Sequence, residues 1–343
     1  MYIGVFLPQS CPEPRLAFNQ TIGYVGGSPL SPLVLKYVDF YRKNRELYVG
    51  TKDVASVAVL RSYASITYNH SHAGLSAFLV EQALIQSNVP FHMIFDEHLE
   101  SLSPSVCKVL ILPDSECLSD RQITLIRRFV EAGGGLIATE QTGLYDVWRR
   151  VRLAPGLQGL VADQSLGKSY QESAMSGSGP LTSGKRNTGA TTHNEVGRGR
   201  VAYMPAIEFD GALPPPEPYF TIGVSLWKRP KNWRQLIDAI VWASQGGLPL
   251  EVQGPEYLIA NVVEQPDRHR RLVHLVNCDA EHVSTIANVK VRCATAAGES
   301  VATVRFYSPE SSGGEPLKSE SRDGMVSFTV PTFKVYGVLE LSA

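Results

Sequence analysis

The sequence lacks the features that mark membrane-spanning, secreted and disulfide-stapled proteins. No apolar run in its 343 residues approaches the roughly 18 residues that span a bilayer. The first residues, MYIGVFLPQS, have no basic segment and too short an apolar stretch for a signal peptide. Cysteine is scarce, and its irregular spacing at positions 11, 107, 117, 278 and 293 forms no metal or disulfide pattern. This usage favours a reducing, cytoplasmic compartment, while a secreted parent protein stays open.

An excess of charge is also missing. The net charge is -1, so the composition gives no reason to expect nucleic acid or an anionic membrane as a partner. The basic run Arg268–Arg271 is interpreted as a solvated hairpin turn. His70 and His72 have metal-ligand spacing without a recognisable third ligand. We therefore expect neither a metal nor an organic cofactor.

A β-α-β unit is predicted between Cys107 and Asp146. Val109–Leu112 is a continuous apolar run, as expected of a parallel strand that is covered on both faces. Ser119 and Gln122 have the spacing of a capping box at the start of an amphipathic helix. Gly133–Gly135 end that helix, because glycine adopts a left-handed C-terminal cap without strain. A second buried strand follows and ends at the Thr139-Glu140-Gln141-Thr142 turn.

The same alternation of strand and helix extends on both sides of this unit. The strand VASVAVL, the helix LSAFLVEQALIQ and the strand FHMIF precede it, and the strand GRVAYMP and the helix KNWRQLIDAIVWA follow. Residues 147–198 are rich in glycine and serine and are predicted to form a long exposed loop. We therefore assign residues 51–250 to an α/β domain with a parallel sheet.

Past Gly246-Gly247 the pattern changes class. Short β-rich segments separated by turn residues, with no helical period between them, predict an antiparallel β-sandwich over residues 251–343. Residues 1–50 do not form a domain of their own. Their punctuation by proline, followed by a helix beginning at Ser31-Pro32, indicates an N-terminal extension and a linker helix.

The ordered segments resemble a known family. VAVLRS, the Tyr68-Asn69 turn, PFHMIFDEHL, VLILPDSECLSD, FVEAGGGLIATEQTGLYD and GRGRVAYMP resemble the β-galactosidase trimerisation domain of family 42 and related glycoside hydrolases. VHLVNCD, FYSPE and VSFTVP resemble the small β domain that closes those enzymes, and FYRKNRELY resembles the helix that leaves their barrel. The resemblance implies a flavodoxin-like doubly wound parallel sheet, related to class I glutamine amidotransferases, followed by a small antiparallel β-sandwich.

The catalytic barrel of that family has no counterpart here. A (β/α)8 barrel needs about 250 residues, and only about fifty precede the first predicted strand. None of the residues that would act as the two carboxylates of a retaining glycosidase can be matched to a position in this chain. We therefore expect a non-catalytic C-terminal module that supports oligomerisation and carbohydrate binding. Whether residues 1–28 are a remnant of the last turn of the barrel stays open.

Two other functions stay open, a stand-alone amidotransferase-like hydrolase and a free-standing carbohydrate-binding or scaffold protein. The resembled amidotransferases place a nucleophilic cysteine after the strand that here ends in Thr139-Glu140-Gln141, and a nucleophile elbow needs small neighbours. Cys117 precedes a helix N-terminus, where a thiolate is favoured, but it follows a different strand. The hydrolase would have to use Cys117 or the Glu140 loop.

Four residues are candidates to face a ligand. Asp114, Glu140, Tyr145 and Asp146 follow predicted parallel strands at their carboxyl ends, where open α/β sheets bind ligands. No partner base or oxyanion motif accompanies them, so a capping or loop-ordering role is the competing interpretation. The sequence therefore predicts ligand-facing residues but no catalytic ones.

Aromatic residues of the N-terminal helix point to self-association. Tyr37, Phe40, Tyr41, Leu47 and Tyr48 give this helix more apolar surface than one small domain obviously buries. We expect a closed symmetric homo-oligomer in which the α/β domain supplies the contacts and the sandwich lies outside.

Other aromatic and histidine side chains have less specific interpretations. Any of the four tryptophans, at positions 148, 227, 233 and 242, is able to stack on a sugar, although Trp233 fits helix core spacing. His274 lies between two apolar residues of a predicted strand and is expected to be structural.

Overall fold

The computed structural model describes residues 32–161, 189–211, 228–279, 284–295, 303–311 and 313–342. The chain divides into two compact units. The first, called here the α/β unit, comprises Val54–Val262 and Val291–Ala294. The second, called here the sandwich unit, comprises the residues up to Asp53, Val263–Lys290 and the residues from Thr295 onward.

A six-stranded sheet forms the centre of the α/β unit, with the strand order β3-β2-β4-β5-β7-β6. Its strands are β2 (Val57–Arg61), β3 (Phe91–Phe95), β4 (Val109–Leu112), β5 (Gly135–Thr139), β6 (Thr192–Val196) and β7 (Gly199–Met204). All neighbours pair in parallel except β6, which is antiparallel to β7 at the edge. The chain first adds β3 on one side of β2 and then adds β4 on the other. The order of strands therefore reverses between β2 and β4.

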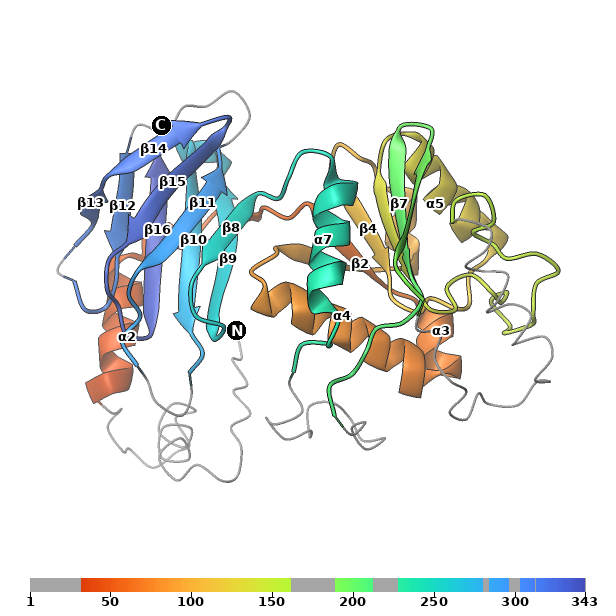
Figure 1. Cartoon of the computed structure of the whole chain (residues 1–343). Coiled ribbons are helices and arrows are strands. Elements are labelled where there is room, and N and C mark those ends of the chain that lie inside the picture. The colour runs from red at the N-terminus through yellow and green to blue at the C-terminus, as the bar shows by residue number, and fades with distance from the viewer. Residues whose placement is uncertain are drawn as a thin grey trace. The chain divides into compact units, whose positions relative to one another are not determined.

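Helices cover both faces of this sheet (Figure 1). On one face, α4 (Leu75–Gln86) and α7 (Trp233–Ser244) pack on Val57, Val109 and Ile137. On the other, α5 (Asp120–Glu131) packs on the intervening strand residues, such as Leu110 and Leu136. Because successive strand residues face opposite sides, the continuous apolar run of β4 is fully buried, as its sequence predicts.

The predicted capping box is present at the start of α5. The Ser119 amide donates to Gln122 Oε1 at 2.6 Å, and the Gln122 amide donates to Ser119 Oγ at 3.1 Å. These two bonds satisfy amides that the helix itself leaves without acceptors. The helix after β2 is more irregular, because α3 (Tyr63–Tyr68) continues into a π-helical turn, η2 (His70–Gly74), before α4.

The prediction of a loop over residues 147–198 is wrong at the C-terminal end of that range. Thr192–Val196 forms β6, which pairs with β7 in register from Thr192 opposite Tyr203. The strand is only half-buried along its length and carries His193, Asn194 and Glu195, so no apolar alternation marks it. Residues 147–161 are irregular, and residues 162–188 lie outside the described segments.

The remaining strands form a six-stranded sheet in the order β1-β9-β10-β16-β12-β13 and a four-stranded sheet in the order β14-β15-β11-β8, and the division into units falls within β9 and β11. The strands are β1 (Lys52–Asp53), β8 (Leu250–Gln253), β9 (Leu258–Gln265), β10 (Arg270–Asn277), β11 (Val289–Ala294), β12 (Thr303–Tyr307), β13 (Glu315–Leu317), β14 (Ser319–Arg322), β15 (Met325–Val330) and β16 (Tyr336–Ser342). Antiparallel pairing, as between β10 and β16, agrees with the predicted fold class. The observed architecture is thus an α/β unit with a mainly parallel sheet, together with antiparallel β-sheets.

The described part of the N-terminal extension belongs to the sandwich unit. Helix α2 (Pro32–Lys43) lies beside the sandwich strands (Figure 1) and leads into the short helix η1 (Arg45–Leu47). Leu47 is 1% exposed and packs against Val263, Leu272 and Val338. This segment is therefore a structural part of the sandwich and not a free linker.

The sandwich also covers part of the aromatic surface that motivates self-association. The Phe40 ring meets Tyr336 edge-on with centroids 6.0 Å apart, and the Tyr48 ring lies 5.7 Å from His274. Tyr41 stays 47% exposed. The helix alone is consequently a weaker argument for an oligomer than its sequence indicates.

The basic run between β9 and β10 is a hairpin turn, but it is not simply solvated. His269 adopts the left-handed conformation that closes the turn. Arg270 and Arg271 point back onto the sheet, where they pair with Glu340 and Glu264 respectively. The prediction from composition is wrong for these two side chains, because carboxylates from neighbouring strands neutralise them. No helix in the described segments is long and apolar enough to cross a membrane.

Candidate functional site

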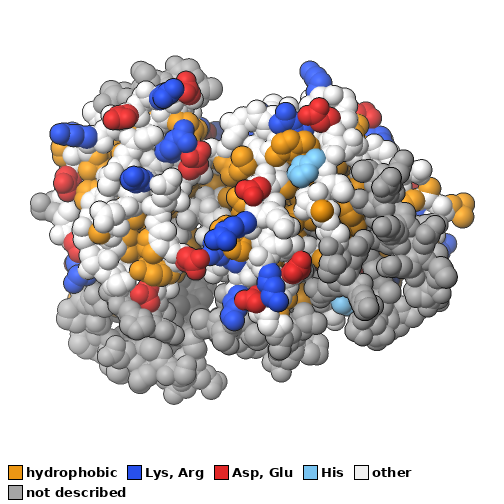
Figure 2. All heavy atoms as spheres, in the orientation of Figure 1, with side chains coloured by type: hydrophobic (Ala, Val, Ile, Leu, Met, Phe, Trp, Pro, Cys, Tyr) orange, Lys and Arg blue, Asp and Glu red, His pale blue; other side chains and the backbone are white. Residues whose placement is uncertain are grey.

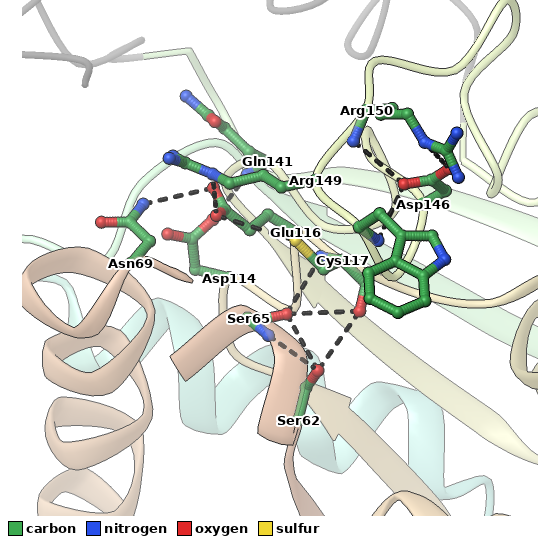
Figure 3. Close-up of polar contacts among 11 residues, drawn as sticks. Ser62, Ser65, Asn69, Asp114, Glu116, Cys117, Gln141, Asp146, Arg149 and Arg150 are labelled. Carbon is green, nitrogen blue, oxygen red and sulfur yellow. Dashed lines mark hydrogen bonds and ion pairs between the residues drawn. The ribbon is translucent and has the colours of Figure 1, made fainter. Parts of the chain in front are cut away.

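A polar cluster lies where the strand order reverses, at the carboxyl ends of β2, β4 and β5. Three segments supply it: the start of α3, the loop after β4 and the irregular chain after β5 (Figure 3). Ser62 is the N-cap of α3 and accepts the Ser65 amide. Switch points of this kind leave a crevice outside the sheet in open α/β folds, and ligands bind there. The cluster is therefore the first place to look for a function.

Asp114 ties the loop after β4 to the turn after β5. Its Oδ1 accepts the Gln141 amide at 3.0 Å, and its own amide donates to Thr139 Oγ1 at 2.9 Å. Its φ of 38° is unusual for a residue with a side chain. Asp114 is 4% exposed, and these contacts order the two loops, so its ligand-facing role stays a prediction.

Glu140 occupies the position of the elbow after β5. Its φ is 53°, a left-handed conformation that side chains disfavour, and such residues concentrate at functional sites. The backbone is held on both sides, since its amide donates to Met204 O at 2.9 Å and its carbonyl accepts from Tyr203 Oη at 2.7 Å. The strained turn is therefore present, but it carries a carboxylate where the resembled enzymes carry a thiol.

Glu116 is a buried carboxylate with two partners. Its side chain is fully buried, Oε1 accepts Arg149 Nε at 2.8 Å, and Oε2 accepts Asn69 Nδ2 at 3.2 Å. Burial raises the pKa of Glu116, and Arg149 and then Asn69 act in the opposite direction. A buried carboxylate is costly unless it is paired, so Arg149 stabilises the charged form. Arg149 itself has a φ of 58°.

The Cys117 thiol is buried beside this carboxylate. Its Sγ lies 3.9 Å from Glu116 Oε1, and its amide donates to Ser65 Oγ at 3.0 Å. Burial, and then the charge of Glu116, raise the pKa of Cys117 to about 12. In the described segments no histidine is recorded as a partner of this thiol. The thiolate that nucleophilic catalysis requires is therefore strongly disfavoured.

Asp146 and Tyr145 also have structural partners. Asp146 Oδ1 accepts hydrogen bonds from the backbone amides of Trp148 and Arg150, at 2.9 Å each. The bond from the Arg150 amide has the larger effect, and both bonds lower the pKa of Asp146. The Tyr145 amide donates to Glu116 O at 2.9 Å, and its ring lies 5.6 Å from the Arg149 guanidinium carbon. Both residues order the chain after β5.

The structure thus brings the predicted candidates together but surrounds them with residues that sequence reasoning missed. Asn69 entered only through the turn that carries the family resemblance, and Glu116 and Arg149 had no recognisable signal. Arg149 lies in an irregular segment, and Asn69 precedes a π-helical turn that hydrophobic periodicity does not predict. Ser62 had a weak signal, because serine is a preferred N-cap residue at the start of a helix.

Two further expectations concern metals and tryptophans. Within the described segments, no group of three or more His, Cys, Asp or Glu side chains is arranged to hold a metal ion. Trp233 and Trp242 pack against the core of the α/β unit, whereas Trp148 is 66% exposed. Trp227 lies outside the described residues. Trp148 is the described tryptophan that is open to a ligand.

Charge is mixed on the surface as it is in the sequence. On the face that Figure 2 shows, Lys and Arg side chains alternate with Asp and Glu side chains over the described residues. No broad field of one sign is visible on that face, in agreement with the net charge of -1.

Comparison with solved structures identifies similar folds among glycoside hydrolases. An α-L-fucosidase, isoenzyme 2 from Paenibacillus thiaminolyticus, is similar with a TM-score of 0.56 and 18% identity over 89% of this chain. The GH42 β-galactosidase Gan42B is similar with a TM-score of 0.53 and 15% identity over 86% of the chain. A catalytic mutant of Gan42B from G. stearothermophilus has a TM-score of 0.52.

The chain spans about half the length of these proteins or less, covering 51% of the fucosidase and 41% of the β-galactosidase. No family model matches the sequence, and no curated protein matches it. At these identities the comparisons establish a fold shared with glycoside hydrolases.

Proposed function

We propose that this chain is a non-catalytic module of a β-galactosidase-like glycoside hydrolase, where it supports oligomerisation and binds carbohydrate. The similar folds are parts of glycoside hydrolases, which supports the assignment to this class. The parallel strands β3-β2-β4-β5-β7 have the chain order 2-1-3-4-5. That order is the flavodoxin-like one, which supports the finer assignment to the β-galactosidase trimerisation domain.

The observation that carries the non-catalytic role is the filled switch point. Glu116 and Cys117 are 0% exposed, and Asp114, at 4%, holds the turn after β5. Catalytic groups of open α/β enzymes need access to a substrate at this position. Here the carboxylates of Asp114 and Glu116 bind groups of the neighbouring loops, which favours a role in stabilising the fold over the presentation of a reactive atom.

A stand-alone amidotransferase-like hydrolase is the second candidate. The left-handed Glu140 favours it, because strained turns after a parallel strand commonly present a functional side chain. The state of Cys117 opposes it, since activated thiols have pKa values of roughly 3.5–7.5 and burial raises the pKa of this one to about 12. We therefore prefer the non-catalytic module.

Activity assays on the purified chain test this choice. We expect no turnover of a panel of nitrophenyl glycosides, nitrophenyl esters or glutamine. Glycoside turnover that survives repurification and follows the protein peak contradicts the non-catalytic role. Ester or glutamine hydrolysis that Cys117→Ser or Glu140→Gln abolishes, and that Trp148→Ala leaves intact, supports the second candidate instead.

Carbohydrate binding is tested separately by calorimetric titration with galactose and galactobiose. We expect weak binding that Trp148→Ala abolishes, because Trp148 is the described indole available for stacking on a sugar ring. Binding that this variant leaves unchanged removes Trp148 from the proposal.

A further inference from the structure

The loop around Trp148 holds an exposed indole on an ordered backbone. The carboxylate oxygen Oδ1 of Asp146 accepts the amides of Trp148 and Arg150 at 2.9 Å each. The Asp146 amide donates to the Arg150 carbonyl oxygen, and the Arg149 amide donates to the Asp146 carbonyl oxygen, also at 2.9 Å each. The backbone on both sides of Trp148 is therefore fixed by the protein's own hydrogen bonds.

Arg149 fastens the same loop to the interior of the α/β unit. Its Nε donates to Oε1 of the fully buried Glu116 at 2.8 Å. In Figure 3 the Arg149 side chain extends toward Glu116, whereas Asp146 and Arg150 lie beside each other on the opposite side, away from Glu116. Single exposed apolar residues are common on protein surfaces. An indole on a preorganised loop is better suited to binding, because little conformational freedom is lost when a ligand arrives.

Asp146 and Arg150 offer hydrogen-bonding groups in this loop. Arg150 Nε donates to Asp146 Oδ2 at 3.0 Å, and the Arg150 side chain is 71% exposed. In the part of the chain that the structure describes, the two terminal nitrogens of the Arg150 guanidinium have no recorded acceptor. Oδ2 keeps a further lone pair, since each carboxylate oxygen accepts about two hydrogen bonds. The ion pair therefore presents donors and an acceptor together, two residues from an exposed indole.

We propose that Trp148 and the Asp146–Arg150 ion pair form one subsite for a neutral sugar, which stacks on the indole and places two adjacent hydroxyls on the pair. One hydroxyl donates to Asp146 Oδ2, and its neighbour accepts from a terminal nitrogen of Arg150, because a hydroxyl both donates and accepts. This combination of an aromatic surface with a few fixed polar groups is typical of sites for small ligands.

Charge selects a neutral sugar over an acidic one. Asp146 and Arg150 neutralise each other, and Glu116 neutralises Arg149, so the loop has no excess charge that attracts an ion. The amide bonds that lower the pKa of Asp146 also keep its carboxylate ionised at neutral pH. That negative charge disfavours the carboxylate of a uronic acid. An apolar protein segment is disfavoured too, because covering the guanidinium donors without supplying acceptors costs free energy.

This inference rests on the carbohydrate binding proposed above and adds the residues that recognise the hydroxyls. NMR titration of galactose with the full chain, observed on the sugar signals, measures the dissociation constant. Arg150→Met removes the donors and keeps an apolar stem, and it should weaken binding at least about fivefold. Arg121→Met is the matched control, because Arg121 is 73% exposed and pairs with Glu100 on the same unit. This control should leave the dissociation constant unchanged.

Galacturonate tests the choice of a neutral ligand and should bind more weakly than galactose. Binding of galacturonate as tight as that of galactose overturns this choice. The Arg150→Met variant should keep the wild-type circular dichroism spectrum, since exposed ion pairs contribute little to stability.

The outcomes separate the subsite from the function on which it rests. Galactose binding that Trp148→Ala abolishes and Arg150→Met leaves unchanged overturns the role of the ion pair, while carbohydrate binding stands. Galactose binding that neither variant changes overturns the whole subsite and still leaves carbohydrate binding standing. A wild-type chain that binds no galactose overturns both.

Discussion

At the scale of single residues, the buried pair of Glu116 and Arg149 dominates the polar cluster. The carboxylate has no access to water, and the guanidinium side chain is 25% exposed. Replacing a whole buried pair by apolar residues is often neutral, but removing one partner leaves a buried charge without compensation. The stability of the cluster therefore depends on Arg149 more strongly than its position in an irregular segment indicates.

Arg149→Met should destabilise the α/β unit by about 3 kcal/mol at neutral pH. Arg150→Met is the control, because Arg150 is 71% exposed and pairs with Asp146 at the surface, where such pairs contribute about 0–1 kcal/mol. The double variant Arg149→Met with Glu116→Gln should recover most of the loss. Urea denaturation, monitored by tryptophan fluorescence, measures the free energy of unfolding of all three variants. Equal losses in the two single arginine variants would contradict the stabilising role assigned to Arg149.

The loss should also depend on pH in a defined direction. Burial raises the pKa of Glu116 above its ordinary value of 4.5, so stability falls as pH rises from the unfolded pKa through the folded one. Arg149 lowers the folded pKa of Glu116, so removing Arg149 raises that pKa further. The pH range between the unfolded and the folded pKa, over which stability falls, then becomes wider. The deficit of Arg149→Met should therefore shrink as the pH falls from 7 toward 4.5.

At the scale of elements, the glycines after α5 have two different physical roles. Gly133 has a φ of 111° and ends the helix, as its sequence predicts. Gly135 begins β5 and is required by packing, because a Cβ there would lie 2.5 Å from the carbonyl oxygen of Ala243 in α7. The sequence pattern alone assigned both to helix termination.

Gly135→Ala should destabilise the α/β unit by about 2–3 kcal/mol, since α7 would have to move away from β5. Gly246→Ala is the matched control beside the same helix, because a Cβ there meets only one atom, at 4.0 Å. Thermal unfolding of both variants provides the measurement. A Gly135→Ala variant as stable as the control would show that the helix shifts at little cost.

At the scale of the whole molecule, the two units contain different titrating groups. In the sandwich unit, His274 Nδ1 lies 2.7 Å from Tyr336 Oη, and the Tyr48 ring lies beside the imidazole. Burial lowers the pKa of His274 from 6.5 to about 4. The neutral imidazole joins η1 to strands β10 and β16, in agreement with the structural role expected from its sequence.

The sandwich unit should therefore lose stability as the pH falls from 6.5 to 4. The folded pKa is the lower one, so the unfolded chain binds the proton first, and the loss approaches about 3 kcal/mol at the end of this window. Scanning calorimetry at pH 7, 5.5 and 4 should show this loss in the unfolding transition of the sandwich unit. The His274→Gln variant should lack the part of the loss that comes from protonation of His274. The same pH dependence in His274→Gln would contradict the role of this histidine.

The sequence by itself determined the elements whose signal is local. The buried run of β4 and the capping box of α5 are contiguous patterns, and the structure agrees with both. The change from α/β alternation to short antiparallel strands likewise needs no distant contact to be recognised. Hydrophobic burial imposes these periods on the chain, so they can be predicted without coordinates.

Only the tertiary structure decided the states of the polar side chains. β6 is polar and half-buried, and its pairing with β7 makes it a strand. Cys117 reads as a thiol before a helix N-terminus, yet the fold surrounds it with Ser65, Glu116 and apolar neighbours. Burial and the charge of a neighbouring side chain control the pKa of a thiol or carboxylate. Those neighbours come from segments far apart in the chain, and only folding brings them together.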